Sequence, residues 1–75
     1  MEKTKMGNQL RELRKKANIT QAELAVRLGV QQSAISHWER GDNLPETRNL
    51  LKMSEIFGCT VDELVKGPQN TAAAV

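Results

Sequence analysis

The polar residues between positions 32 and 40 have the types and spacing that indicate a chemical role. They lie on the face of a helical pattern opposite to Ile35 and Trp38. An α-helix fits the DNA major groove, where amides, hydroxyls and guanidinium groups can bind base edges or phosphates. A merely solvated helix face would more often carry Glu and Lys. The outward set holds one arginine and no acid, which favours an anion-facing surface: Gln32, Ser33, Ser36, His37 and Arg40.

Catalytic and metal-binding interpretations of the same region are not supported. His37 and Glu39 have the His-x-Glu spacing of zinc deaminases, but the cysteine pair of that chemistry is absent. One cysteine and one histidine are too few ligands for a structural zinc site. No catalytic carboxylate pair, phosphate-binding glycine loop or nucleophile–base set can be assembled. The sequence therefore predicts no enzyme activity, no metal and no cofactor.

The length and charge of the chain narrow the class of protein further. Seventy-five residues allow one small domain, and no apolar run approaches the ~20 residues of a membrane helix. A single cysteine excludes an internal disulfide and favours a reducing, cytoplasmic setting. Eleven basic residues against nine acidic ones give a net charge of +2, a weak indication of a polyanionic partner. Six of the basic residues, against two acids, fall within residues 1–20.

The spacing of apolar residues, together with residues typical of helix ends, predicts an all-α fold. No segment alternates with period two. Five helices are expected, over about residues 6–17, 21–28, 32–40, 47–57 and 61–66, and residues 67–75 are expected to form a disordered tail beyond a domain of residues 1–66. The residues expected to face the core are Met6, Leu10, Leu13, Ala17, Leu24, Leu28, Ile35, Trp38, Leu50, Leu51, Ile56, Phe57, Val61 and Leu64.

Two of these helices begin with a capping box, in which a Thr hydroxyl and a Glu three residues later each accept a backbone N–H. The pairs are Thr20 with Glu23 and Thr60 with Glu63. Asn18 suits the left-handed conformation that ends the first helix. Four of the five glycines (29, 41, 58 and 67) fall at expected helix ends.

The second and third helices form a steep helix–turn–helix pattern. Counted from Gln21, apolar residues stand at positions 4, 8, 10, 15 and 18. Ala25 provides the small side chain needed at the contact point, and Gly29 provides the unhindered backbone of the turn. The five apolar positions, Ala25 and Gly29 thus meet seven requirements of the pattern within 20 residues. This packing holds the polar face of the third helix outward.

Five segments resemble the Cro/CI-type (Xre-like) helix-turn-helix family, most closely the DNA-binding domains of lambdoid phage repressors. They are QLRELR (9–14), TQAELA (20–25), AISHWERG (34–41), LLKM (50–53) and TVDEL (60–64). The resemblance covers about residues 4–66. It implies a five-helix, lambda-repressor-like domain that binds palindromic double-stranded operator DNA as a homodimer, with the third helix in the major groove.

The resemblance also implies roles for individual residues. Gln32, Ser33, Ser36 and His37 match base-contacting positions. Gln21 matches a phosphate-binding Gln that steadies the first residue of the recognition helix, and Arg14 with Glu39 matches an internal ion pair between the first and third helices. Residues at positions near the phosphate backbone are Thr20, Arg40, Asn43 and Arg48.

The sequence departs from the family pattern at three places. Gln31 stands where a Ser, Thr or Asp usually caps the third helix, so the start of that helix is less defined. Ser33 and Ser36 are short and read bases ambiguously. Asp42 replaces a common basic residue and should weaken phosphate attraction there.

Three further residues have interpretations of their own. Trp38 could stack on a base, but its inward phase favours core packing. Cys59 is expected to be a small buried apolar residue between the fourth and fifth helices. His37 is a candidate for base or phosphate contact, with a solvated ring as the alternative.

The leading hypothesis is a cytoplasmic, nucleoid-associated transcriptional repressor in a bacterium or phage-infected cell. One alternative is an antitoxin or adaptor on the same fold, with a toxin or antirepressor as protein partner and with Val26 and Val65 available for contact. Another is the DNA-binding fragment of a longer repressor. Because the charge is modest, non-specific affinity should be weak and tight binding should require two half-sites.

Overall fold

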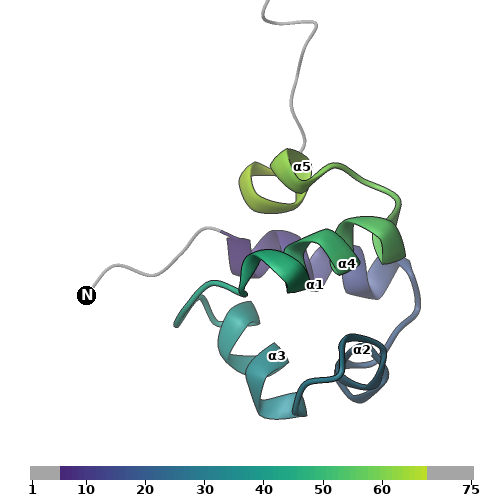
Figure 1. Ribbon diagram of the computed structural model, residues 1–75, viewed down its shortest axis with the longest axis vertical. Coiled ribbons are helices and arrows are strands. Elements are labelled where there is room, and N and C mark those ends of the chain that lie inside the picture. Colours follow the sequence, from purple (N-terminus) through teal and green to yellow (C-terminus); the bar gives the residue numbers. More distant parts are fainter. Residues whose placement is uncertain (1–5, 68–75) are drawn as a thin grey trace, which may run out of the picture.

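The helical fold class expected from the sequence is confirmed. A computed structural model describes residues 6–67, and within that span the chain forms five helices and no strand (Figure 1). The helices are α1 (Met6–Lys16), α2 (Gln21–Leu28), α3 (Gln32–Glu39), α4 (Thr47–Phe57) and α5 (Val61–Lys66). Residues 1–5, and all of the expected tail 67–75 except Gly67, lie outside the described residues.

The helices are arranged so that α2 and α3 stand at one end of the molecule and α5 at the other (Figure 1). Helix α1 contacts both α3 and α5, and α4 contacts α5 and α2. Figure 1 shows α2 nearly end-on while α3 crosses the view, so the two helices meet at a steep angle. None of the helices between residues 6 and 67 is both long and apolar enough to cross a membrane.

The starts of α2 and α5 are fixed by the two expected capping boxes. The hydroxyls of Thr20 and Thr60 each accept the backbone N–H three residues later at 3.0 Å. In return, the carboxylates of Glu23 and Glu63 accept the Thr backbone N–H at 2.9 Å. The pKa of both carboxyls lies below the ordinary value. The largest cause is the hydrogen bond from the Thr backbone N–H, and the next is hydrogen bonding with the Thr side chain.

Helix α3 begins without such help. Gln31 occupies the N-cap position with an extended backbone, and its side chain makes no capping hydrogen bond. The helix forms nonetheless, because Ile35 and Trp38 are buried against the core. Tertiary packing therefore compensates for the missing cap.

Gly7 allows α1 to approach α3 closely, a role that its position inside a helix did not predict. A Cβ at this residue would overlap the backbone carbonyl of Glu39 and lie 2.9 Å from the carbonyl oxygen of Trp38. Gly29 serves the different purpose foreseen for it: its φ of 72° turns the chain between α2 and α3. Asn18 adopts the expected left-handed conformation, with φ of 58°.

The core expected from apolar spacing is largely present, with corrections at its margin. Ala17 is exposed, because the helix ends at residue 16 and the chain turns away. Leu51 is 52% exposed on the outer side of α4, where Met53 is fully buried instead. Ile19, in the loop before α2, was missed and is also buried.

Three residues near the C-terminal end of the domain also differ from expectation. Val61, expected to face the core, is half-buried and is not among the side chains packed against the core. Val65, expected outside the apolar stripes, packs against the core. Cys59 is half-buried rather than buried, and it contacts the same core. Partial burial, together with the nearby Glu63 carboxylate, raises the pKa of its thiol.

Candidate nucleic-acid interface

The turn between α2 and α3 fixes the orientation of the candidate recognition helix. The backbone N–H of Val30 donates to the carbonyl of Ala25 at 3.0 Å, beside the left-handed Gly29. Ala25 is buried, as expected for the point where the two helices touch. With Ile35 and Trp38 turned into the core, the opposite face of α3 is left at the surface. Core packing of Trp38, the interpretation favoured from its phase, is confirmed.

The exposed face of α3 carries the residues expected to contact bases. Gln32, Ser33 and His37 are exposed, and Ser36 is half-buried. The hydroxyl of Ser33 lies 3.5 Å from Oε1 of Gln31, one residue before the helix. These side chains offer hydrogen-bond donors and acceptors, which can pair with the major-groove edges of bases.

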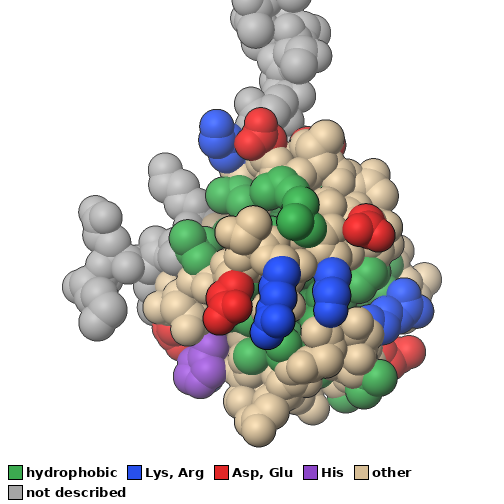
Figure 2. Space-filling model, in the orientation of Figure 1, with side chains coloured by type: hydrophobic (Ala, Val, Ile, Leu, Met, Phe, Trp, Pro, Cys, Tyr) green, Lys and Arg blue, Asp and Glu red, His purple; other side chains and the backbone are tan. Residues whose placement is uncertain are grey.

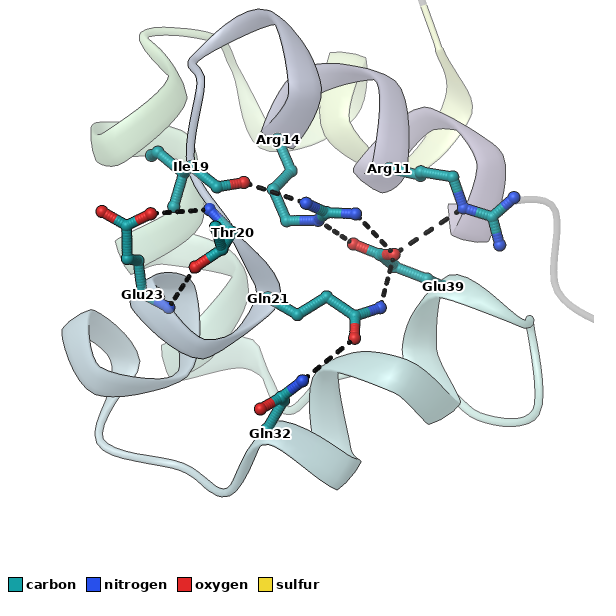
Figure 3. A network of polar contacts seen from close by, with 8 residues as sticks. All are labelled: Arg11, Arg14, Ile19, Thr20, Gln21, Glu23, Gln32 and Glu39. Atoms are coloured by element: carbon teal, nitrogen blue, oxygen red, sulfur yellow. Dashed lines mark hydrogen bonds and ion pairs between the residues drawn. The ribbon is translucent and has the colours of Figure 1, made fainter.

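A buried ion pair ties α1 to the end of α3. Arg14 Nε donates to Glu39 Oε2 at 2.5 Å, and its Nη2 donates to Oε1 at 3.3 Å (Figure 3). Arg14 also donates from Nη1 to the carbonyl of Ile19 at 2.9 Å, which anchors the loop before α2. Glu39 is only 3% exposed. The residues expected to form an internal pair are therefore in contact, and Arg14 does not lie on the candidate DNA-binding face.

Gln21 links this buried pair to the recognition helix. Its Nε2 donates to Glu39 Oε1 at 3.0 Å, and its Oε1 lies 3.5 Å from Nε2 of Gln32. Figure 3 shows the resulting chain of contacts from α1, through the end of α3 and the start of α2, to the first residue of α3. Because Glu39 fixes which end of the Gln21 amide donates, the amide oxygen faces Gln32.

The start of α2 is also suited to anion binding. The first residues of a helix present free N–H groups and the positive end of the helix dipole. Gln21 is the first residue of α2 and is half-buried, and Thr20 before it is exposed. Gln21 and Gln32 are thus in contact at the start of α2, whereas Thr20 pairs with Glu23 (Figure 3).

The remaining phosphate candidates are not joined to that place. Among the described residues, Asn43 and Arg48 make no hydrogen bond or ion pair with α2 or α3, and both are exposed. The Arg48 guanidinium lies 3.8 Å from the carboxylate of Glu46. Arg40 is paired with Asp42, its Nε lying 3.2 Å from Oδ2. Both arginines therefore have acidic neighbours in the free protein.

Two functional neighbours were missed by the sequence analysis. Arg11 Nε lies 3.7 Å from Glu39 Oε1, so a second guanidinium serves the buried carboxylate; its spacing of three residues from Arg14 was a usable signal. Asp42, expected only to repel phosphate, contacts both His37 and Arg40. No short sequence pattern predicts that contact, because it depends on how the chain turns after α3. Within residues 6–67, no group of three or more His, Cys, Asp or Glu is placed to hold a metal ion.

Comparison with known proteins assigns the family. The helix-turn-helix family matches residues 10–64, which include α2, the turn and α3. The chain belongs to the Cro/CI-type (Xre-like) helix-turn-helix family. The family is one of DNA-binding transcription regulators.

Individual members of this helix-turn-helix family align over most of the chain. Repressor protein C2 of Salmonella phage P22 is 45% identical over 83% of this chain and 29% of its own length. The transcriptional activator BcrR of Enterococcus faecalis is 40% identical over 84% of this chain and 31% of its own length. The chain thus spans less than a third of the length of these two relatives.

A solved structure of the P22 c2 repressor, in complex with a synthetic operator, has the same fold. It superposes with a TM-score of 0.79 and 44% identity, covering 84% of this chain and 96% of that one. The likeness extends over the whole helical unit rather than the α2–α3 pair alone. The lambda-repressor-like fold implied by the sequence resemblance is therefore confirmed.

Proposed function

We propose that this protein is a transcriptional regulator that binds a palindromic operator as a homodimer, with α3 in the major groove of double-stranded DNA. The observation that carries the proposal is the contact chain from Glu39 through Gln21 to Gln32. It locks the first residue of an exposed, acid-free helix face to a helix N-terminus suited to phosphate. Such a pairing sets the register of α3 against the DNA backbone.

In this proposal the residues divide between two tasks. Gln32 forms two hydrogen bonds with one base, for which adenine is the matching partner. Ser33, Ser36 and His37 contact neighbouring base edges, and all four lie on α3. The residues assigned to phosphates are Thr20, Gln21, Arg40, Asn43 and Arg48.

The charge distribution supports a binding mode in which two half-sites act together. The arginines near the proposed interface have acidic neighbours: Arg14 pairs with Glu39, Arg40 with Asp42, and Arg48 lies near Glu46. On the face shown in Figure 2, Lys and Arg side chains are interspersed with Asp and Glu and form no continuous patch. Non-specific attraction to phosphate should then be weak, and a dimer on two half-sites supplies the affinity that one domain lacks.

The relatives favour a regulatory role. The P22 repressor is a repressor by name and has been solved in complex with a synthetic operator, while BcrR is named an activator. Repression is proposed here on the higher identity to the P22 protein. A regulator of this kind acts in the cytoplasm, where the DNA is, and that location is part of the proposal.

Selection of binding sites from random duplex DNA tests the proposal. The expected result is an enriched palindrome with half-sites one helical turn apart, about 10 base pairs centre to centre, or a multiple of that spacing. Sedimentation with and without the selected duplex gives the stoichiometry, which should be two chains per site. Failure to enrich any motif at physiological salt would contradict sequence-specific binding.

A second candidate is a protein-binding module, an antitoxin or adaptor. The observation in its favour is Val26, which is 81% exposed on α2 and makes no contribution to the core. A toxin or antirepressor could bury this side chain. Val26→Ser should then weaken binding of the partner and leave DNA selection unchanged. A DNA regulator without such a partner would also keep its DNA selection, but it would show no partner binding for the substitution to weaken.

A further inference from the structure

The C-terminal end of α3 holds a second group of polar contacts, separate from the Gln21 chain. After α3, Gly41 adopts a left-handed conformation with φ of 80°, and the backbone N–H of Asp42 donates to the carbonyl of His37 at 2.9 Å. This turn folds the Asp42 side chain back onto α3. Its Oδ2 lies 3.2 Å from His37 Nδ1 and 3.2 Å from Arg40 Nε.

Asp42 and Arg40 require opposite forms of the His37 ring. A hydrogen bond from Nδ1 to the Asp42 carboxylate needs a proton on Nδ1. Arg40 Nη2 lies 3.0 Å from the same Nδ1, and a guanidinium can only donate, so that contact needs an unprotonated Nδ1. The neutral ring cannot satisfy both at once. Its other nitrogen, Nε2, is an acceptor in the first case and a donor in the second.

DNA binding removes this competition. Arg40 is assigned to a phosphate, which attracts a guanidinium through charge-assisted hydrogen bonds. Once Arg40 turns to a phosphate, the Asp42 carboxylate remains beside Nδ1. A carboxylate facing one ring nitrogen accepts a hydrogen bond from it, and so favours the tautomer with the proton on that nitrogen.

We propose that Asp42 is a positioning residue that sets the base preference of His37. Resting on the proposed function, the inference is that Asp42 holds the Nδ1 proton of His37 in the DNA complex, so that Nε2 accepts a hydrogen bond. In the major groove only adenine and cytosine offer an amino group as donor. His37 therefore selects an adenine or a cytosine at one position of each half-site.

The inference also accounts for an acid at a place where it should repel DNA. Asp42 adds a negative charge near the proposed phosphate contacts and lowers affinity for every sequence. In exchange it restricts His37 to one hydrogen-bonding form, which discriminates between bases. Asp42 thus lowers the affinity for all DNA sequences and raises the discrimination between bases.

The test is binding-site selection at pH 8. The wild type is compared with His37→Ala, Asp42→Ala and Asp42→Asn. His37→Ala should lose a preference of about 2- to 10-fold for adenine or cytosine at one position, the range expected of one hydrogen bond. Asp42→Ala should lose the same preference at the same position, and the double variant should lose no more than either alone.

Asp42→Asn separates the acceptor from the charge. Its side-chain oxygen can still accept the Nδ1 proton, so it should retain the base preference while affinity rises for all sequences. Glu46→Ala is the matched control, because Glu46 is an exposed acid that lies beside Arg48. It should raise affinity generally and leave every base preference unchanged.

A direct reading of the ring is available, because His37 is the single histidine of the chain. Nitrogen NMR of the wild type bound to its selected duplex at pH 8 should show a protonated Nδ1 and an unprotonated Nε2. In the Asp42→Ala variant, the form with the proton on Nδ1 should no longer be the main one in the spectrum.

The outcomes separate this inference from the proposed function. A wild type that selects no motif would overturn both. A selected motif with guanine or thymine at the His37 position, or a preference that Asp42→Ala leaves intact, would overturn the role of Asp42 and leave the regulator intact.

Discussion

Gln21 donates a hydrogen bond of 3.0 Å from Nε2 to the buried carboxylate of Glu39. A residue proposed to bind phosphate is therefore oriented by the interior of the protein rather than by the DNA. Because Glu39 also accepts a hydrogen bond from Arg14, the geometry of the proposed interface depends on an ion pair that lies inside the protein. We therefore expect this one carboxylate to contribute both to stability and to the proposed recognition, and the two contributions can be measured separately.

Replacing Arg14 with Ala should destabilise the fold more than it weakens DNA binding per folded molecule. The substitution leaves the Glu39 carboxylate buried without its main partner, at a cost of about 3–5 kcal/mol. Chemical denaturation gives the free energy of unfolding, and titration with operator DNA gives the affinity of the folded fraction. Arg11→Ala is the control, since Arg11 is more exposed and lies farther from the carboxylate. An Arg14→Ala protein with an unchanged free energy of unfolding but a lost affinity for operator DNA would indicate that Arg14 contacts DNA instead.

Gln32→Ala should relax the base preference at one position of the operator. Loss of two hydrogen bonds to a base costs about 1–3 kcal/mol on the selected operator and little on random DNA. Competition titrations with single-base operator variants measure the effect. Melting temperature serves as the control, because Gln32 is exposed and contributes no core packing. A Gln32→Ala protein with the wild-type sequence preference would refute the assignment of α3 as the reading helix.

Arg48→Ala should weaken binding to all DNA sequences alike. Loss of one phosphate contact releases one fewer counterion, so the slope of log affinity against log salt should flatten by about one unit. Lys66→Ala is a matched loss of one positive charge on α5, at the opposite end of the molecule from α2 and α3 (Figure 1). It should leave the slope unchanged. Equal effects of the two variants would exclude a specific phosphate contact at Arg48.

Glu23→Gln should reduce the dependence of stability on acid pH. The Thr20 hydrogen bonds lower the pKa of Glu23 below its ordinary 4.5, so the folded state favours the charged carboxylate. The resulting stabilisation is present above pH 4.5 and is lost as the pH falls through the lowered pKa. Gln keeps an acceptor oxygen but does not titrate. The free energies of unfolding of the two proteins should differ most at neutral pH and converge toward pH 3; a constant difference would contradict the capping contribution.

Gly7→Ala should destabilise the domain although Ala favours helices. Its methyl group would overlap the Glu39 carbonyl, and overpacking of this kind costs about 1–3 kcal/mol. Asn8→Ala, an exposed change on the same helix, should alter stability by no more than about 0.5 kcal/mol. Denaturant titrations of the two variants compare them directly. A Gly7→Ala protein as stable as the wild type would show that α1 can move away from α3 without cost.

The sequence by itself determined the elements of this protein. The starts of α2 and α5 are local features, since the two capping boxes involve residues only three apart. The turn before α3 follows from Gly29 and Ala25, whose roles depend on backbone freedom and side-chain size. The apolar spacing along each helix also predicted that Leu24, Ile35 and Trp38 lie in the core, and all three are buried.

Only the tertiary structure decided how those elements act on one another. The exposed Leu51 and the buried Met53 both carry large apolar side chains on α4, and which one is covered depends on the neighbouring helices. Gly7 is required because α1 and α3, far apart in sequence, nearly touch. The contacts of Glu39 with Gln21, and of Asp42 with His37, likewise depend on the relative placement of helices and turns. Side-chain types and spacing identified the candidate base-contacting residues on α3, and the family resemblance added the other phosphate candidates. The hydrogen-bond geometry around Gln21, Gln32 and His37 exists only in the folded chain.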